Sequence, residues 1–118
     1  MANTDTIKLL KECDAGSKMA VTSIDDVMDY VSDEKLKSLL DESKKHHEKL
    51  GNEIHEALNN AHADEKEPAM MARGMSWLKT NMKLAMDESD SVIAELMTDG
   101  CDMGVKSLYQ YLNDYDDA

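Results

Sequence analysis

The fold is decided by the short stretch Ser32-Asp33-Glu34. Serine and aspartate are preferred at the residue that caps the start of a helix, and a glutamate in the first turn complements the positive end of the helix dipole. The stretch separates two long runs of residues with helical spacing. It therefore predicts a very short turn between two antiparallel helices.

The residues before this turn predict a first helix over residues 4–31. Asn3 or Thr4 is expected to cap its start, with Asp5 in the first turn. Its inward stripe repeats every three or four residues, the spacing of a helix packed in a bundle. The members of this stripe are Ile7, Leu10, Asp14, Ser17, Val21, Ile24, Met28 and Val31.

The residues after the turn predict a second helix that extends to about residue 61, followed by a loop over residues 62–68. Pro68, the sole proline, suits the first turn of a third helix. The stripe of the second helix has the same spacing as the first. Its members are Leu36, Leu40, Ser43, His47, Leu50, Ile54, Ala57 and Ala61.

Two further helices are predicted, over residues 69–86 and 90–115. Gly100 leaves an alternative open for the last one, because a turn at Asp99-Gly100 would interrupt it. The sequence therefore predicts one all-α domain over residues 1–118, an antiparallel up-down-up-down four-helix bundle. The stripe expected to face inward on the last helix consists of Ile93, Leu96, Met97, Met103, Leu108, Tyr111 and Leu112.

The predicted helices differ in length, and the third is too short to cover the first two. Apolar surface near the first turn is therefore expected to stay open in one chain. We expect a second copy to cover it, which predicts a homodimer. The residues assigned to this interface are Val21, Ile24, Met28, Val31, Leu36 and Leu40.

Charge and composition exclude several classes of partner. The 118 residues carry a formal net charge of -12, so the chain repels the phosphates of nucleic acids and of anionic membranes. No run of about 18 apolar residues predicts a membrane span, and residues 1–13 do not resemble a signal peptide. Cys13 and Cys101 show no metal-binding spacing, and we expect them to stay reduced in the cytoplasm.

Polar residues interrupt both long stripes. Ser17 and His47 lie equally far from the turn, so they are expected to meet inside the bundle, with Asp14 and Ser43 one turn away. Such a cluster is either a hydrogen-bonded pair within the core or a site for a metal or small ligand. A carboxylate beside a buried histidine would favour its charged form.

A surface pair and one more carboxylate extend the list of candidate metal ligands. Glu42 and His46 share a face of the second helix, and Asp102 lies on the last predicted helix. A di-iron bundle enzyme needs Glu-x-x-His on two helices, and this sequence has none. No catalytic residue is assigned and no cofactor is expected, apart from a divalent metal such as iron, zinc or manganese in the metal-binding interpretation.

Four short segments carry a resemblance to a known family. They are Ile7-Lys8-Leu9-Leu10 with Asp14-Ala15-Gly16, residues 33–40, residues 73–79, and Ala94-Glu95-Leu96 with Gly100. The chain resembles a small bacterial ferritin-like family of uncharacterised function. Its relatives tend to place Glu after the glycine on the first and fourth helices, where this chain has Ser17 and Cys101.

Two interpretations of function follow. The first is a non-catalytic ferritin-like bundle that acts through dimerisation or protein contacts. It is favoured because the apolar stripes of the helices are regular and the sequence shows no recognisable set of catalytic residues. The alternative is a ferritin-like protein that binds iron, zinc or manganese at a degenerate site around Asp14 and His47.

Overall fold

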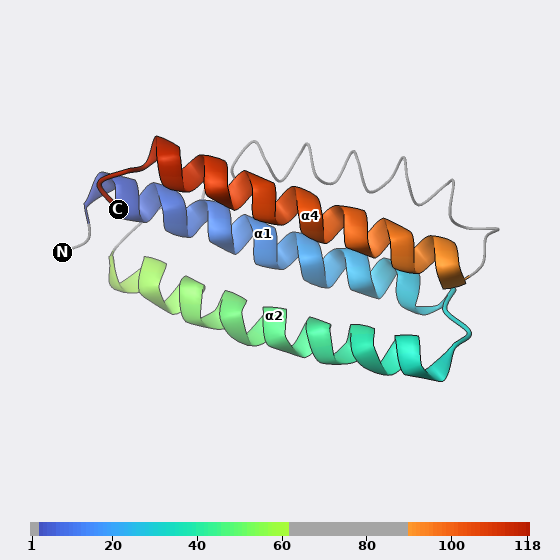
Figure 1. The fold of residues 1–118 in the computed structure, drawn as a ribbon. Coiled ribbons are helices and arrows are strands. Elements are labelled where there is room, and N and C mark those ends of the chain that lie inside the picture. Colours follow the sequence, from blue (N-terminus) through green and yellow to red (C-terminus); the bar gives the residue numbers. More distant parts are fainter. Residues whose placement is uncertain (1–2, 62–89) are drawn as a thin grey trace.

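A computed structural model describes residues 3–61 and 90–118 (Figure 1). These residues form three long helices: α1 (Thr4–Met28), α2 (Glu34–Asn60) and α4 (Asp90–Asp114). They contain no strand. The predicted all-α class is therefore confirmed for the part of the chain that the structure describes.

The predicted four-helix bundle is wrong, because the described residues form three helices rather than four. The third predicted helix, over residues 69–86, and the loop over residues 62–68 lie outside the described residues. The contact of α1 with α2 is also much more extensive than its contact with α4. A four-helix bundle needs each helix to lie against two neighbours, whereas a repeating stripe shows only that one face is apolar.

The first helix begins as its capping residue predicts and ends earlier than expected. The side chain of Asn3 accepts a hydrogen bond from the backbone N–H of Thr6 at 2.8 Å, which satisfies one free amide of the first turn. α1 ends at Met28 rather than Val31. Val31 lies outside both helices but is buried, with 3% of its surface exposed.

The turn between α1 and α2 is held from two sides. Asp33 caps α2, because its carboxylate accepts a hydrogen bond from the N–H of Leu36 at 2.9 Å. The carboxylate of Asp90, the first residue of α4, accepts hydrogen bonds from the backbone N–H groups of Ser32 at 2.9 Å and Asp33 at 2.7 Å. The predicted cap is therefore confirmed, and Asp90 adds a contact that the sequence does not predict.

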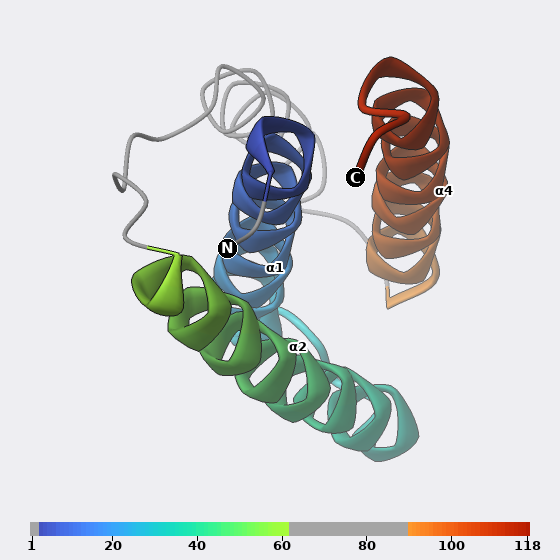
Figure 2. The same ribbon diagram turned by 90° about the vertical axis from the view of Figure 1, so that its left-hand side faces the viewer.

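Both α2 and α4 run antiparallel to α1 (Figure 1). Seen from the end in Figure 2, they lie on different sides of α1. α4 begins beside the α1–α2 turn and ends beside the start of α1. There the Asn3 amide donates to the carbonyl of Asp117 at 2.7 Å, and the N–H of Asp117 donates to the carboxylate of Asp5 at 3.2 Å.

The main hydrophobic core lies at the end of the molecule that holds the turn. Its buried members come from α1, the turn, α2 and the first half of α4. They are Ile24, Val27, Val31, Leu40, Ile93 and Leu96. Val27 and Ile93 are the most completely buried large side chains of the described residues, each with 1% of its surface exposed.

The residues predicted as a dimer interface lie in or beside this core. Ile24, Val31 and Leu40 are members of it, Met28 and Leu36 pack against it, and Val21 is half-buried. The surface expected to stay open is therefore closed within one chain, because the first half of α4 occupies it. Homodimerisation stays a prediction, and it would have to use another surface.

The third described helix, α4, is continuous. Gly100 lies inside it, so the alternative turn at Asp99-Gly100 does not form. Within the described ranges, no helix combines the length and the apolar character required to cross a membrane.

Candidate functional site

The predicted inward polar cluster is divided between two helices. On α1, the hydroxyl of Ser17 donates to the backbone carbonyl of Asp14 at 2.9 Å, and the carboxylate of Asp14 pairs with Lys18 at 2.9 Å. Ser17 is buried, with 4% of its surface exposed. Both polar residues of the first stripe therefore bond to groups about one turn away on their own helix.

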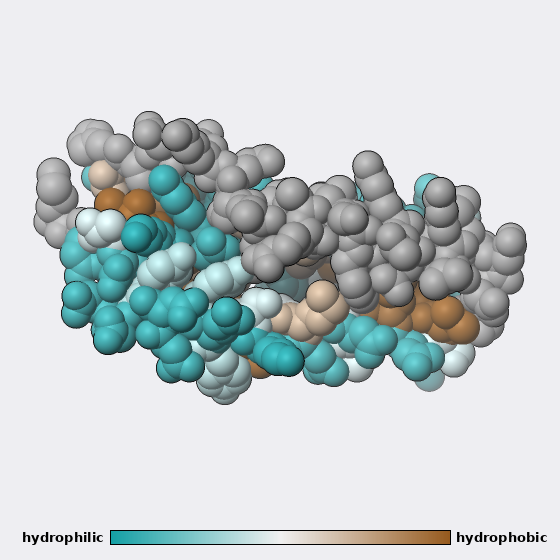
Figure 3. All heavy atoms as spheres, turned by 90° about the horizontal axis from the view of Figure 1, so that it is seen from above, coloured by the Kyte–Doolittle hydropathy of each residue, from teal (hydrophilic) through white to brown (hydrophobic). Residues whose placement is uncertain are grey.

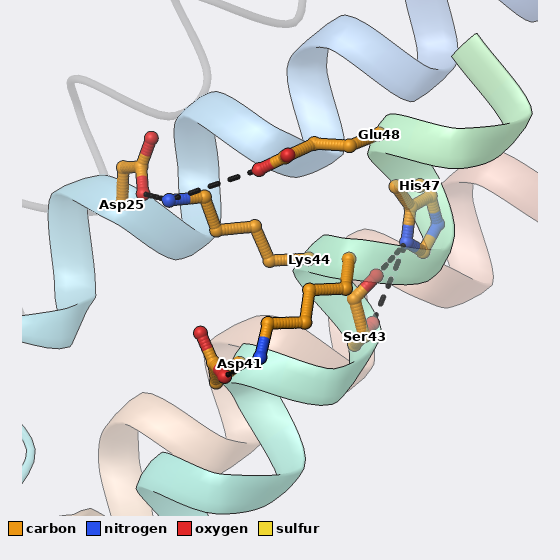
Figure 4. Close-up of polar contacts among 7 residues, drawn as sticks. Asp25, Asp41, Ser43, Lys44, His47 and Glu48 are labelled. Carbon is orange, nitrogen blue, oxygen red and sulfur yellow. Dashed lines mark hydrogen bonds and ion pairs between the residues drawn. The ribbon is translucent and has the colours of Figure 1, made fainter. Parts of the chain in front are cut away.

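His47 likewise bonds within its own helix (Figure 4). Its Nδ1 atom lies 2.7 Å from the backbone carbonyl oxygen of Ser43 and 3.5 Å from the Ser43 hydroxyl. A carbonyl oxygen only accepts hydrogen bonds, so the short contact places a proton on Nδ1. The four residues of the predicted cluster thus form two separate pairs.

This separation follows from the register of α1 against α2. Ser17 was expected to face His47, but it faces Gly51, one helical turn further along α2. A Cβ atom at Gly51 would lie 3.0 Å from the Ser17 hydroxyl oxygen. Asp33 has an extended backbone, and extended residues advance about 3.3 Å each instead of about 1.5 Å in a helix. The connection is therefore longer than the tight turn predicted, which displaces α2 along α1.

A lysine on α2 makes a polar contact with α1 (Figure 4). The Nζ atom of Lys44 lies 2.6 Å from the carboxylate of Asp25 on α1 and 3.8 Å from that of Glu48. The hydrogen bond to Asp25 raises the pKa of Lys44, partial desolvation opposes it, and the charges of Asp25, Glu48 and Asp41 add to it. This contact supports the same register as the close approach of Gly51.

The other predicted metal ligands lie on exposed surfaces. The Nε2 atom of His46 lies 3.9 Å from the carboxylate of Glu42 across one turn of α2, with the side chains of Glu42 and His46 71% and 76% exposed. Asp102 is exposed on α4. The structure does not gather these residues with Asp14 and His47 into one group of ligands within the described ranges. Binding of a divalent metal stays a prediction.

A different acidic group forms where the two ends of the described chain meet. Carboxylate oxygens of Asp5, Asp116 and Asp117 lie within 4.8 Å of one another. The sequence does not predict this group, because Asp5 and Asp117 are 112 positions apart. The carboxylate of Asp5 accepts the N–H of Asp117, which is a structural role. We assign no metal to this group.

Aromatic residues hold the last turn of α4 near the start of α1. The rings of Tyr111 and Tyr115 stack with centroids 6.2 Å apart, and the Nζ atom of Lys8 lies 5.8 Å from the Tyr115 ring centroid. Desolvation raises the pKa of Tyr115, and the nearby carboxylates, Glu12 foremost, raise it further. The end of α4 is therefore attached to α1 by polar and ring contacts.

The outer face of the second half of α4 is apolar and exposed. Four large side chains of this face are exposed: Val105 by 53%, Leu108 by 40%, Tyr109 by 67% and Leu112 by 52%. Cys101, one turn before Val105, is exposed as well. Steps of three and four residues place these five side chains in one row, which we name the α4 stripe.

This exposure corrects the inward face predicted for the last helix. Met103, Leu108 and Leu112 were expected to face the core, but 45%, 40% and 52% of their surfaces are exposed. The row that continues from Met97 passes through Gly100, Gly104 and Ser107, of which Gly100 and Ser107 are half-buried and Gly104 is exposed. A Cβ atom at Gly104 would meet nothing within 4 Å. This run of small residues is the sequence signal that reveals the reversal.

An acidic row borders the α4 stripe on one side. Glu95, Asp99 and Asp102 follow at steps of four and three residues, and all three are exposed. At about 100° per residue, the row lies roughly a quarter turn around the helix from the stripe. Lys106 is the only basic residue of α4. Seen from above, the described surface is mainly hydrophilic, with hydrophobic residues gathered toward both ends (Figure 3).

No protein-family model, curated protein or solved structure matches this chain. The resemblance to a bacterial ferritin-like family stays a prediction. Any functional proposal must therefore start from the surface of this chain itself.

Proposed function

We propose that this protein is a non-catalytic helical module that binds a protein partner through the α4 stripe. The observation that supports this most directly is the exposure of Val105, Leu108, Tyr109 and Leu112 in one row. Scattered apolar residues are normal on a protein surface, whereas a contiguous apolar patch is typical of an interaction site.

The size of these side chains makes the stripe a useful contact. Fully burying a leucine or valine side chain is worth roughly 1.5–3 kcal/mol, and these side chains have about half of their surface left to bury. Binding must also offset the lost freedom of the two partners. We therefore expect a few residues of the stripe to supply most of the affinity.

The remaining polar and thiol groups support a non-catalytic role in the cytoplasm. Asp14, Ser17 and His47 bond within their own helices. Burial raises the pKa of Cys13, with a smaller contribution from the charge of Glu12, so its nucleophilic thiolate is disfavoured. Both Cys13 and Cys101 are free thiols, which suits a reducing compartment.

Site-specific photo-crosslinking tests the proposal. We would introduce a benzophenone amino acid at Tyr109, or as a control at Glu56, which is exposed on α2. Irradiation of cells that make the protein should yield discrete adducts with a second polypeptide from position 109 only. The double substitution Leu108→Ser/Leu112→Ser should remove them. The proposal fails if position 109 gives no adduct, or if both positions give the same adducts.

A further inference from the structure

We propose that the segment bound by the α4 stripe is a basic amphipathic helix of a different protein. This inference rests on the proposed function and adds the chemistry of the partner. The stripe provides apolar anchors from Cys101 to Leu112 at helical spacing. An apolar row of this kind fits the apolar face of a second helix laid along it.

The length of the stripe sets the length of its partner. Cys101 and Leu112 are eleven positions apart on a continuous helix, which corresponds to roughly 16 Å at about 1.5 Å per residue. A partner helix of about three to four turns covers this distance. Its own apolar side chains would recur every three or four residues so that they stay on the side facing α4.

The charge beside the α4 stripe determines the sign of the charge expected on the partner helix. Glu95, Asp99 and Asp102 form the acidic row, and Lys106, four residues beyond Asp102 on the same face, is the only basic residue on α4. The whole chain carries a formal net charge of -12. A helix with lysine or arginine beside its apolar face would therefore be attracted to α4 and oriented on it.

The same charges disfavour a second copy of this chain as the occupant. α4 contains five acidic residues, Asp90, Glu95, Asp99, Asp102 and Asp114, against the single Lys106. Two copies paired through their stripes would bring two such acidic helices together. Like charges at an interface oppose binding, so a partner of opposite charge is favoured.

Three synthetic peptides of about five helical turns test the charge and the shape of the partner. The first has leucines in one row and lysines elsewhere, the second replaces each lysine with glutamate, and the third scrambles the first. The readout is the alkylation rate of Cys101, which lies on the stripe, with Cys13 as internal control. The first peptide should bind and slow alkylation of Cys101 alone, and binding should weaken as salt rises.

Matched variants separate the stripe from general attraction. Leu108→Ser/Leu112→Ser should lower affinity for the basic peptide about tenfold, whereas Leu39→Ser/Leu50→Ser, which alters exposed leucines of α2, should not. Asp99→Asn/Asp102→Asn should weaken binding more than Glu53→Gln/Glu56→Gln, an equal change of charge on α2. Circular dichroism would verify that each variant keeps its helices.

Several results would overturn the proposal. The proposal fails if the acidic or scrambled peptide binds as tightly as the basic peptide, or if the basic peptide does not bind. It also fails if the charge variants of α4 and α2 weaken binding equally. Self-association that protects Cys101 in the peptide-free protein would identify a second copy as the occupant. Crosslinks from position 109 without binding of the basic peptide would refute only this partner class. Absence of those crosslinks would refute the proposed function itself.

Discussion

The two halves of α4 are parts of one continuous helix, yet they have opposite relations to the rest of the molecule. In the first half, Ile93 and Leu96 are buried, with 1% and 7% of their surfaces exposed. In the second half, Val105 and Leu112 are 53% and 52% exposed. Apolar character is similar in both halves, so it does not decide burial by itself.

The difference lies in the side chains that face inward. In the first half, large aliphatic residues meet the core members of α1 and α2. In the second half, the same row continues through the small residues Gly100, Gly104 and Ser107, and the large aliphatic residues Val105, Leu108 and Leu112 are exposed. A helix can therefore change from a core element to a surface element within a few turns.

The largest expected effect is the loss of a core side chain from the first half of α4. Ile93→Ala should lower the free energy of unfolding by about 2–5 kcal/mol, because it leaves a cavity among well-packed residues. Val105→Ala, in the second half, should change it by less than about 0.5 kcal/mol. Chemical denaturation monitored by circular dichroism measures both. Equal losses would show that the two halves do not differ as described.

The next effect concerns the carboxylate that attaches α4 to the turn. Asp90→Ala removes two hydrogen bonds to backbone amides and should lower the free energy of unfolding by about 1–3 kcal/mol. Asp99→Ala, an exposed site on the same helix, is the control and should have little effect. Hydrogen exchange of the Ser32 and Asp33 amides should accelerate in the first variant only. Unchanged exchange there would contradict the role of Asp90.

A smaller effect distinguishes two glycines. Gly104→Ala should stabilise the protein by about 0.5–1 kcal/mol, because alanine favours the helix and the added methyl group meets open space. Gly51→Ala should gain less, since its Cβ would lie 3.0 Å from the Ser17 hydroxyl oxygen. Adding Ser17→Ala to Gly51→Ala should remove this close contact and restore the stabilisation expected of alanine in a helix. Thermal unfolding of the single and double variants measures the coupling between the Gly51 and Ser17 substitutions. If the two effects simply add, Ser17 does not face Gly51 and the helix register differs from the one described.

The smallest expected effect concerns the rate at which the Cys13 thiol is alkylated, and not the stability of the protein at neutral pH. Burial raises the pKa of Cys13 above its ordinary value of 9.0, and the charge of Glu12 adds to this rise. Cys13 should therefore alkylate more slowly than the exposed Cys101, and its rate should keep increasing above pH 9. The folded state also holds this proton more tightly than the unfolded state, so this thiol lowers stability as the pH rises beyond 9. Mass spectrometry of alkylated peptides measures both rates, and faster labelling of Cys13 would contradict the described burial.

Local signals in the sequence were sufficient for much of the helical structure. Asn3 and Asp33 cap their helices through their own side chains, and the amides that they bond lie three residues away. Helical spacing identified Ile93 and Leu96 as inward residues, because burial requires apolar side chains to recur on one face, whereas Ile24 and Leu40 were assigned to an interface and are buried within the chain. These features depend on neighbours in the sequence.

The tertiary structure alone decided which of these faces meet. The connection that includes the extended Asp33 displaces α2 along α1, so Ser17 faces Gly51 and the predicted cluster with His47 does not form. Asp90 reaches a turn 57 and 58 positions away. Contacts between distant segments depend on register and orientation, which helical periodicity leaves undetermined because it describes each helix by itself.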